Sequence, residues 1–149
     1  MNDVSDFDPS VFFTTGARPG SAQLLGFRFE DADPDAGTIT ISFEGKPEFT
    51  NPAGFIQGGL LIAMLDDTMG PAVVVASRGK HYAPTITLNA HFLRPVRPGR
   101  LRVDAKVTQL GRSVAFVDSQ LYDERGRLCV TASVSCHLQT WDQVRGSQS

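Results

Sequence analysis

The segment 51–59 reads NPAGFIQGG and combines turn-forming residues, two side-chain amides and a Gly-Gly pair. If a helix begins near Gln57, the free backbone N–H groups of its first turn and the positive end of its macrodipole would favour a developing negative charge. Gly58 and Gly59 have no Cβ and would let a carbonyl approach the backbone closely. Asn51 and Gln57 could donate from their side chains or hold the loop through turn hydrogen bonds. The segment is therefore a candidate oxyanion hole, and the alternative is an irregular loop with a glycine-rich helix start.

Two adjacent carboxylates, Asp66 and Asp67, interrupt the apolar segment that follows. They lie about 100° apart around a helix, so at most one can easily face water or a polar groove. A carboxylate in such a helix is costly unless it is paired or catalytic, so one is a candidate nucleophile or general base; the alternative makes both structural. Gly58 precedes Asp66 by about 12 Å along a helix, so Asp66 cannot attack a carbonyl held at the start of its own helix. A complete site would need two chains whose helices lie antiparallel across a two-fold axis.

These residues must be positioned by one long helix and a sheet. The segment 57–76 is too long for a strand, and its apolar residues surround it, which predicts a helix that is buried on most sides. A strand pattern starts at Leu24, and the turn signal DPDAG at 33–37 predicts a hairpin with the strand that follows. Further segments alternate with a period of two and are separated by turns, namely 85–93, 101–108, 113–122 and 128–138.

About six strands and one long helix predict an α+β fold, in which an antiparallel sheet wraps around the helix that covers its apolar face. One helix shields such a sheet poorly, so an identical partner subunit is expected. We expect a single domain at residues 24–140. It follows an N-terminal lead-in at 1–23, which could include a short helix near Pro9–Thr15, and precedes a flexible tail at 141–149.

Composition and charge argue against several classes of function. The 149 residues carry a formal net charge of −2, which gives no general attraction to nucleic acid or anionic lipid. The apolar segment 60–76 is interrupted by the two aspartates, Gly70 and Pro71, so it is not expected to span a membrane. The acidic N-terminus lacks the basic start and apolar run of a signal peptide, so a cytoplasmic protein is expected. The three histidines lie far apart in the sequence, and we assign no metal and no cofactor.

Three stretches of the sequence together resemble a known enzyme family. They are NPAGFIQGGLLIAMLDD at 51–67, TITLNAHFLRP at 85–95 and GRSVAF at 111–116. The chain resembles the hotdog-fold acyl-CoA thioesterases of the phenylacetate-degradation (PaaI-like) type over about residues 24–138. The resemblance implies the hotdog fold, homodimers that pair into tetramers, and hydrolysis of an acyl-CoA thioester at the dimer interface without a metal.

The resemblance also implies roles for individual residues. Asp66 would be the nucleophile or the base that activates water, and Gly58 would donate its backbone N–H to the thioester oxygen. Asn51 would orient the thioester or the attacking water, and Thr85 matches a hydroxyl residue that can assist the water. The family usually has His-Gly-Gly where this chain has Gln57 followed by two glycines, so Gln57 would act as a hydrogen-bond donor that does not titrate.

Coenzyme A would need cations for its phosphates, and Arg94, Arg97 and Arg112 each lie next to Pro or Gly in predicted turns. These arginines are the candidates for the phosphate contacts. The expected substrate is an acyl-CoA with a medium-chain or aryl acyl group, whose pocket would depend on apolar side chains such as Phe92. An alternative is a non-catalytic acyl-CoA binding or sensing protein, because hotdog domains are also used in that way. The presence of Asp66 after the loop disfavours this alternative.

Overall fold

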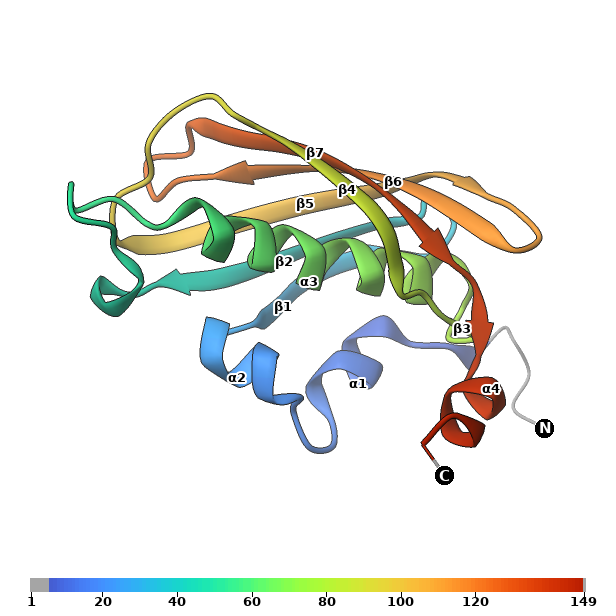
Figure 1. Ribbon diagram of the computed structural model, residues 1–149. Coiled ribbons are helices and arrows are strands. Elements are labelled where there is room, and N and C mark those ends of the chain that lie inside the picture. The colour runs from blue at the N-terminus through green and yellow to red at the C-terminus, as the bar shows by residue number, and fades with distance from the viewer. Residues whose placement is uncertain (1–5, 149) are drawn as a thin grey trace.

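An antiparallel sheet wraps around one long helix, α3 (Gly58–Ala76), in residues 6–148, which the computed structural model describes (Figure 1). Within that range the sheet has six strands in the order β1-β2-β5-β6-β7-β4. They are β1 (Arg28–Asp33), β2 (Thr38–Gly45), β4 (Thr85–Phe92), β5 (Gly99–Leu110), β6 (Val114–Tyr122) and β7 (Leu128–His137). The predicted α+β class, with a sheet of about six strands around one helix, is confirmed.

Helix α3 forms the centre of the core because it carries apolar side chains on several sides. Met64, Leu65 and Met69 on this helix are completely buried. Inward-facing residues of the sheet, such as Ile39 and Ile41 of β2, alternate with outward-facing ones and belong to the same core cluster. The sequence therefore located this helix correctly, and burial fixes it against the sheet.

The first strand begins later than the sequence pattern predicts. Helix α2 (Gly20–Leu25) includes Leu24, where a strand was expected to start, and β1 starts at Arg28. Gly26 ends α2 in the left-handed conformation, with a φ of 68°. Leu25 is buried in the core. This tertiary contact favours the helix, and a period-two pattern in the sequence cannot show it.

Turn residues join the strands as the sequence predicts. The β1–β2 hairpin is confirmed, and Asp33 Oδ1 accepts from the backbone N–H groups of Asp35 and Ala36 in its turn. Two short strands, β3 (His81–Tyr82) and β8 (Gln139–Thr140), form a separate small sheet, and a 3-10 helix, η2 (Pro47–Phe49), follows β2. These short elements were not expected from the sequence.

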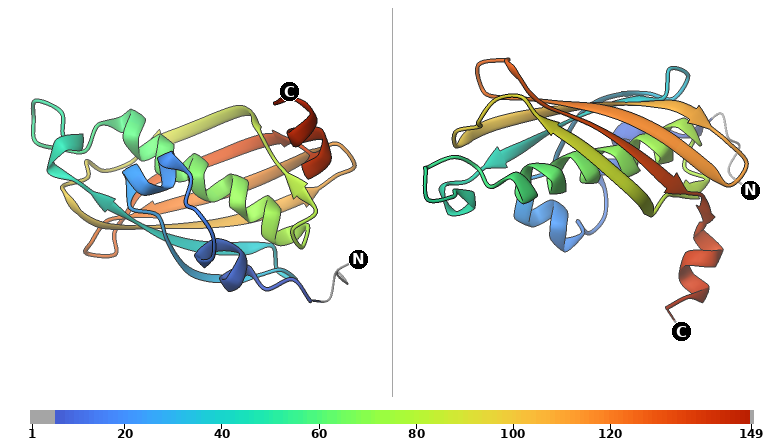
Figure 2. Two further views of the ribbon diagram at one scale, coloured as in Figure 1. Left: turned by 90° about the horizontal axis from the view of Figure 1, so that it is seen from below. Right: turned by 45° about the horizontal axis from the view of Figure 1, so that its top comes forward.

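The N-terminal segment lies on the side of α3 that faces away from the sheet (Figures 1 and 2). The short helix expected near its start is α1 (Pro9–Thr14). Phe13 of this helix stacks on Phe29 of β1, with ring centroids 5.8 Å apart. Most of the predicted lead-in is thus a cover over α3, and its first five residues lie outside the described range.

The C-terminal segment also contains a helix, α4 (Trp141–Gly146), where a flexible tail was expected. Trp141 Nε1 donates a hydrogen bond to the Gly79 carbonyl at 2.8 Å, and its ring lies 5.7 Å from that of Tyr82. The start of the expected tail is therefore attached to the body of the domain, and residue 149 lies outside the described range.

Strand β4 lies at one edge of the sheet and leaves apolar side chains in solvent. Ile86, Phe92 and the following Leu93 are 55%, 50% and 55% exposed. In a strand with a period of two, Ile86, Leu88, Ala90 and Phe92 would share one face, but only Leu88 and Ala90 pack against the core. An edge strand with uncovered apolar residues is a surface suited to pairing with another chain.

Helix α3 is long and apolar enough, by length and composition alone, to cross a membrane. Half of its most apolar stretch is buried inside the described structure, and the core helix of a soluble protein passes the same test. The helix is therefore only weak evidence for a membrane span.

Candidate active site

The loop 51–57 is held in shape by hydrogen bonds to Asn51. Its Oδ1 accepts from the backbone N–H groups of Ala53 and Phe55 at 3.0 and 3.1 Å, and its own backbone N–H donates to the Phe55 carbonyl at 2.7 Å. Gly54 has a φ of 84°, a value that favours glycine. Asn51 thus uses its side-chain oxygen to hold the loop, and its amide NH₂ remains as the donor that could reach a ligand.

Helix α3 starts directly after this loop and presents free backbone donors. Gln57 is the N-cap residue, and its carbonyl accepts from the N–H groups of Leu60 and Leu61. The N–H groups of Gly58 and Gly59, the first two of the helix, have no acceptor among residues 6–148. The Gln57 side chain is exposed and makes no capping hydrogen bond. Two backbone donors and one amide are therefore available at the positive end of the helix macrodipole.

The ring of Phe92, at the end of β4, lies against Gly58. A Cβ on Gly58 would be 3.3 Å from two of the ring carbons, whereas a Cβ on Gly59 would meet open space. Because Phe92 is half exposed, its ring can move more easily than a buried one. The sequence suggested Phe92 as a pocket residue, and the structure places it at the helix start.

Asp66 lies in the middle of α3 and faces the start of β4. Thr85 Oγ1 donates a hydrogen bond to Asp66 Oδ1 at 2.6 Å, so one carboxylate oxygen has a fixed partner. The second oxygen has no hydrogen bond to another residue of the described chain. Burial first, and then the charge of Asp66, raise the pKa of the Cys136 thiol on β7 to about 11, so this thiol stays protonated at neutral pH. The protonated thiol is a poor nucleophile, so Asp66 remains the candidate reactive group here.

Asp67, the next residue, has different surroundings. It lines a cavity under the N-terminal segment, and its Oδ2 is buried without a hydrogen-bond partner in the described part of the chain. Burial, and secondarily the charge of Asp66, raise the pKa of Asp67 to about 6. The two carboxylates therefore lie on different sides of the helix, as their separation of about 100° around it predicted.

The candidate residues form two groups within one chain. Asp66 and Thr85 make one group, and Asn51, Gln57 and Gly58 make the other. The helix separates Gly58 from Asp66 by about 12 Å. In a single chain, the carboxylate and the N–H donors cannot act on the same carbonyl group.

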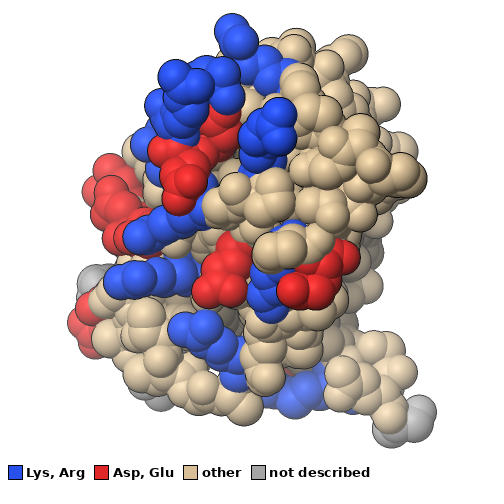
Figure 3. Space-filling model, turned by 90° about the vertical axis from the view of Figure 1, so that its left-hand side faces the viewer, with Lys and Arg blue, Asp and Glu red and all other residues tan. Residues whose placement is uncertain are grey.

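The predicted phosphate-binding arginines are also divided. Basic and acidic side chains are interspersed on the end of the molecule that Figure 3 shows, and α3 begins at this end. Arg94 and Arg97 are exposed residues of the connection 93–98 between β4 and β5, and the Arg97 guanidinium is 4.9 Å from the centroid of the Phe55 ring. Arg112 lies in the turn between β5 and β6, at the opposite end of the sheet (Figure 1). It could join the other two only from a second copy of the chain.

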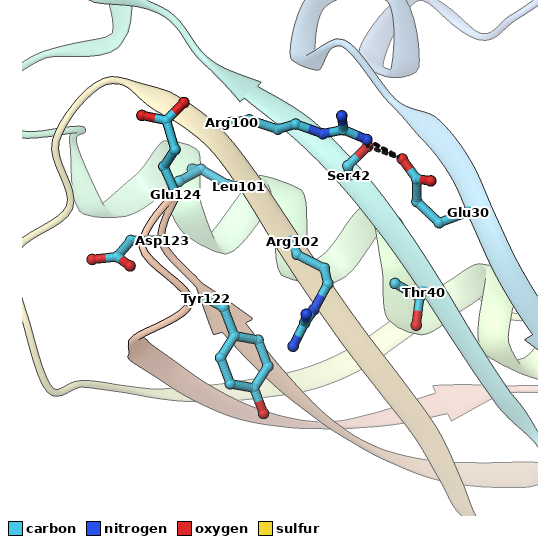
Figure 4. A pocket seen from close by; sticks show the side chains of 10 residues that line it. Glu30, Thr40, Ser42, Arg100, Leu101, Arg102, Tyr122, Asp123 and Glu124 are labelled. Carbon is cyan, nitrogen blue, oxygen red and sulfur yellow. Dashed lines mark hydrogen bonds and ion pairs between the residues drawn. The ribbon is translucent and has the colours of Figure 1, made fainter.

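A cavity of about 410 Å³ lies on the outer face of the sheet (Figure 4). None of the candidate catalytic or phosphate-binding residues lines it. Glu30 accepts from Ser42 Oγ at 2.6 Å and forms an ion pair with Arg100, and the hydrogen bond from Ser42 is the main cause that lowers the pKa of Glu30. The Arg102 guanidinium lies 4.5 Å from the centroid of the Tyr122 ring. The charged, hydroxyl and aromatic side chains of this cavity thus interact with one another across neighbouring strands, which is typical of a solvated sheet face.

Histidine, cysteine and acidic residues do not suggest a metal site in the structure. Between residues 6 and 148, no three such side chains gather in a way that could hold a metal ion.

Comparisons with known proteins match the chain to thioesterases. The family model of the thioesterase superfamily matches residues 53–130. A phenylacetic acid degradation-related protein from Ralstonia eutropha is 33% identical, with a TM-score of 0.80 over 87% of this chain and 98% of that one. The 1,4-dihydroxy-2-naphthoyl-CoA hydrolase of Escherichia coli is 25% identical over 119 residues, 78% of this chain and 86% of the relative. The Escherichia coli PaaI protein from the phenylacetic acid degradation operon is 17% identical and shares the fold, with a TM-score of 0.76 over 91% of this chain and 93% of that one.

The matched region contains Gly58, Asp66 and Thr85, and it covers more than half of the chain. The fold of the relatives agrees with the sheet wrapped around α3. The chain therefore belongs to the thioesterase superfamily and is a thioester hydrolase with the hotdog fold.

Proposed function

We propose that the protein hydrolyses an acyl-CoA with a medium-chain or aryl acyl group to the free acid and CoA, at sites shared between two subunits. Each site would combine Asp66 and Thr85 of one chain with Asn51, Gln57 and Gly58 of the partner subunit. The observation that carries the proposal is the separation on α3. A hydrogen-bonded carboxylate and a pair of free helix N–H groups lie on one helix, about 12 Å apart. The two kinds of group can therefore act on the same carbonyl only if they come from two copies of the chain.

The uncovered edge strand β4 supports a dimer as the active form. Pairing of β4 with the same strand of a second copy would continue the sheet and cover Ile86, Phe92 and Leu93. A two-fold axis at this edge would place the two α3 helices antiparallel, which brings Asp66 of one chain toward Gly58 of the partner subunit. We further propose that two such dimers associate into a tetramer, as the family resemblance implies.

The proposed chemistry follows from where negative charge develops. The N–H of Gly58, with the Gln57 and Asn51 amides beside it, would stabilise the oxyanion that forms when the thioester carbonyl is attacked. The free oxygen of Asp66 either attacks the carbonyl carbon itself or removes a proton from the water that attacks. The C–S bond then breaks, and the CoA thiolate leaves and takes a proton. Where Asp66 has attacked directly, water hydrolyses the resulting acyl–Asp66 anhydride, which releases the free acid and restores the carboxylate. Thr85 would hold the carboxylate in place and could assist the water.

The CoA part of the substrate would be held near the start of α3. Arg94 and Arg97 lie in the connection that passes this end, and Arg97 is held against Phe55 of the loop. Arg112 of the partner subunit would complete the phosphate contacts if the dimer is formed through β4. The reaction so proposed needs no separate cofactor, because CoA is part of the substrate, and we propose that it takes place in the cytoplasm.

The proposal is tested by comparing wild-type protein with an Asp66→Asn variant on short, long and aromatic acyl-CoA thioesters. Released thiol measures turnover, and size-exclusion chromatography with light scattering measures assembly. We expect wild-type turnover on at least one medium-chain or aryl thioester and a decrease of about 10²-fold or more in kcat for the variant, with the dimer intact. Full activity in the variant would remove Asp66 from the mechanism. Binding of these thioesters without hydrolysis by the wild type would instead favour a sensing role.

A further inference from the structure

The loop that precedes α3 is held on one side by the connection that follows β4. The backbone N–H of Ile56 donates to the Val96 carbonyl at 2.7 Å, and both of these side chains are buried. On the other side of the loop, the N–H of Gln57 donates to the Phe49 carbonyl at 2.8 Å. The two residues before Gly58 are therefore fixed by backbone hydrogen bonds to two different parts of the chain.

The connection that follows β4 has a sequence that restricts its own shape. It reads RPVRP at 94–98, and its two prolines fix φ at about −65°. A residue that precedes proline is biased toward extended conformations, so Arg97 has few backbone states available. Val96 anchors the connection in the core, whereas Arg97 beside it is exposed. The backbone thus brings the Arg97 side chain to a defined place next to the loop.

The Arg97 side chain lies over the ring of Phe55. Its guanidinium is 4.9 Å from the ring centroid, which is within the range of a cation–π contact. None of the ion pairs among residues 6–148 involves Arg97. In the described part of the chain, this cation therefore contacts an aromatic ring rather than a carboxylate.

Phe55 is the residue through which this contact reaches the candidate oxyanion donors. Its N–H donates to Asn51 Oδ1 at 3.1 Å, and its carbonyl accepts from the Asn51 N–H at 2.7 Å. Only Ile56 and Gln57 separate Phe55 from Gly58. A shift of Phe55 would consequently move the Asn51 amide and the donors of Gln57 and Gly58 together.

Little else covers this loop on its outer side. Residues 52–54 are exposed, and the half-buried Phe55 has the largest side chain of the loop. Exposed loops open locally at low free energy when few side chains hold them. Oxyanion donors must lie at about 3 Å from the charge that develops, and a misplacement of about 1 Å can cost about 10²-fold in rate. A modest contact at Phe55 can therefore have a measurable effect on turnover.

We propose that Arg97 is a positioning residue for hydrolysis, which acts through Phe55 to hold the loop 51–57 in the arrangement that binds the oxyanion. This role is separate from the phosphate contact proposed for Arg97 and does not depend on a phosphate. The inference rests on the proposed function, because it assumes that the donors at the end of this loop stabilise the oxyanion.

Substrates without phosphates separate the two roles of Arg97. The probes are the hexanoyl and benzoyl thioesters of CoA and of N-acetylcysteamine, which keeps the thioester and lacks every phosphate of CoA. Arg97→Met removes the guanidinium and keeps a long apolar side chain, and Phe55→Leu removes the ring. The double variant measures the coupling between the two residues. Phe55→Tyr keeps an aromatic face and should retain most of the activity.

The matched control is a second arginine that lies over a half-buried aromatic ring. The exposed Arg102 has its guanidinium 4.5 Å from the centroid of the Tyr122 ring, on the outer face of the sheet. Arg102→Met and Tyr122→Leu therefore make equivalent changes away from the loop. Both should leave kcat and KM near the wild-type values, which separates a role of Arg97 from the general cost of losing such a contact.

We expect kcat/KM on the N-acetylcysteamine thioesters to fall about threefold or more in Arg97→Met and in Phe55→Leu. The double variant should be no slower than the slower single variant. On the CoA thioesters kcat should fall by a similar factor, and a lost phosphate contact should add an increase in KM. If Arg97→Met raises KM for the CoA thioesters alone, or if the two losses are additive, the assignment is wrong.

Amide hydrogen exchange tests the positioning role without turnover. Exchange followed by mass spectrometry reports the N–H groups of the loop that are bonded to Asn51, Val96 and Phe49. We expect these groups to exchange faster in Arg97→Met than in the wild type and in Arg102→Met. Unchanged exchange would overturn the assignment, whether or not the wild type is active.

The two measurements also separate this inference from the proposed function. Faster exchange in Arg97→Met, with no hydrolysis of any of the thioesters by the wild type, would retain the role of Arg97 in ordering the loop and reject the proposed function. Hydrolysis by the wild type, with neither kinetics nor exchange altered in Arg97→Met, would retain the proposed function and reject the role of Arg97.

Discussion

The hydrogen bond from Thr85 to Asp66 determines which carboxylate oxygen is free to react. The contact of 2.6 Å orients the carboxylate without adding a positive charge beside it. We expect Thr85→Val, which keeps the branched shape but removes the hydroxyl, to lower kcat/KM by about tenfold or more. Thr85→Ser should keep most of the activity. Steady-state kinetics with thermal unfolding as a control for stability makes the comparison, and equal rates for Thr85→Val and wild type would show that the contact is only structural.

The buried carboxylate of Asp67 predicts a dependence of stability on pH. Because the folded protein raises the pKa of Asp67 from 3.8 to about 6, the folded state binds the proton more tightly than the unfolded state does. The contribution of this group to the free energy of unfolding is therefore greatest below pH 4 and decreases as pH rises to about 6. The full shift would correspond to about 3 kcal/mol, and partial solvent access reduces it to the order of 1 kcal/mol.

The Asp67→Asn variant isolates this contribution from other acidic groups, such as Asp8 and Glu30, whose pKa values are lowered and whose effects have the opposite sign. We expect the variant to unfold at a higher denaturant concentration than the wild type at pH 8, and at nearly the same concentration at pH 4. Urea unfolding followed by circular dichroism measures both. A constant difference between the two proteins across this pH range would contradict the assigned pKa.

At the scale of the element, one substitution at the start of α3 can remove a single backbone N–H donor. Gly58 is the first residue of the helix, where proline is well tolerated, and the preceding Gln57 has a φ of −58° and a ψ of 134°, which suit a residue before proline. Gly58→Ala adds a Cβ close to Phe92 but keeps the N–H, whereas Gly58→Pro adds the same Cβ with two further ring carbons and removes the N–H. Comparing the two variants therefore separates the loss of the donor from the crowding.

We expect kcat of Gly58→Pro to fall about 10²- to 10³-fold below that of Gly58→Ala, as is typical when one oxyanion donor is removed. Thermal unfolding of both variants should be similar. If the two variants have the same kcat, the Gly58 N–H does not contact the thioester oxygen.

Most of the elements could be predicted because their patterns are local. The apolar segment that became α3 is long, and β5, β6 and β7 alternate over enough residues to be recognised. The assignment at Leu24 was wrong because a short apolar run fits a strand or a helix equally well, and burial of Leu25 in the core decides between them. The candidate residues 51–66 could be found from their types and spacing. The cavity beside Asp67 could not, since it exists only where α1 and the following connection fold back over the central helix.

At the scale of the whole molecule, shared sites predict that two inactive variants can restore each other. A heterodimer of Asp66→Asn and Gly58→Pro contains one site with both defects and one site with neither. Random mixing gives half heterodimers, so activity should return to about a quarter of the wild-type value. The two variants would be unfolded and refolded together, and released thiol measured against each variant refolded alone. Failure to regain activity, with heterodimers demonstrated by mass spectrometry, would place both groups of a site in one chain.

The separation of Gly58 and Asp66 on one helix has a further consequence for the proposed dimer. Helix α3 is one continuous helix buried in the core, so in the proposed dimer a movement that shifts Asp66 in one site also shifts the Gly58 N–H in the other. Substrate bound at either site would then alter the geometry at both. We expect the two sites to communicate, so that the second substrate molecule binds with a different affinity from the first and the rate depends on substrate concentration in a non-hyperbolic way.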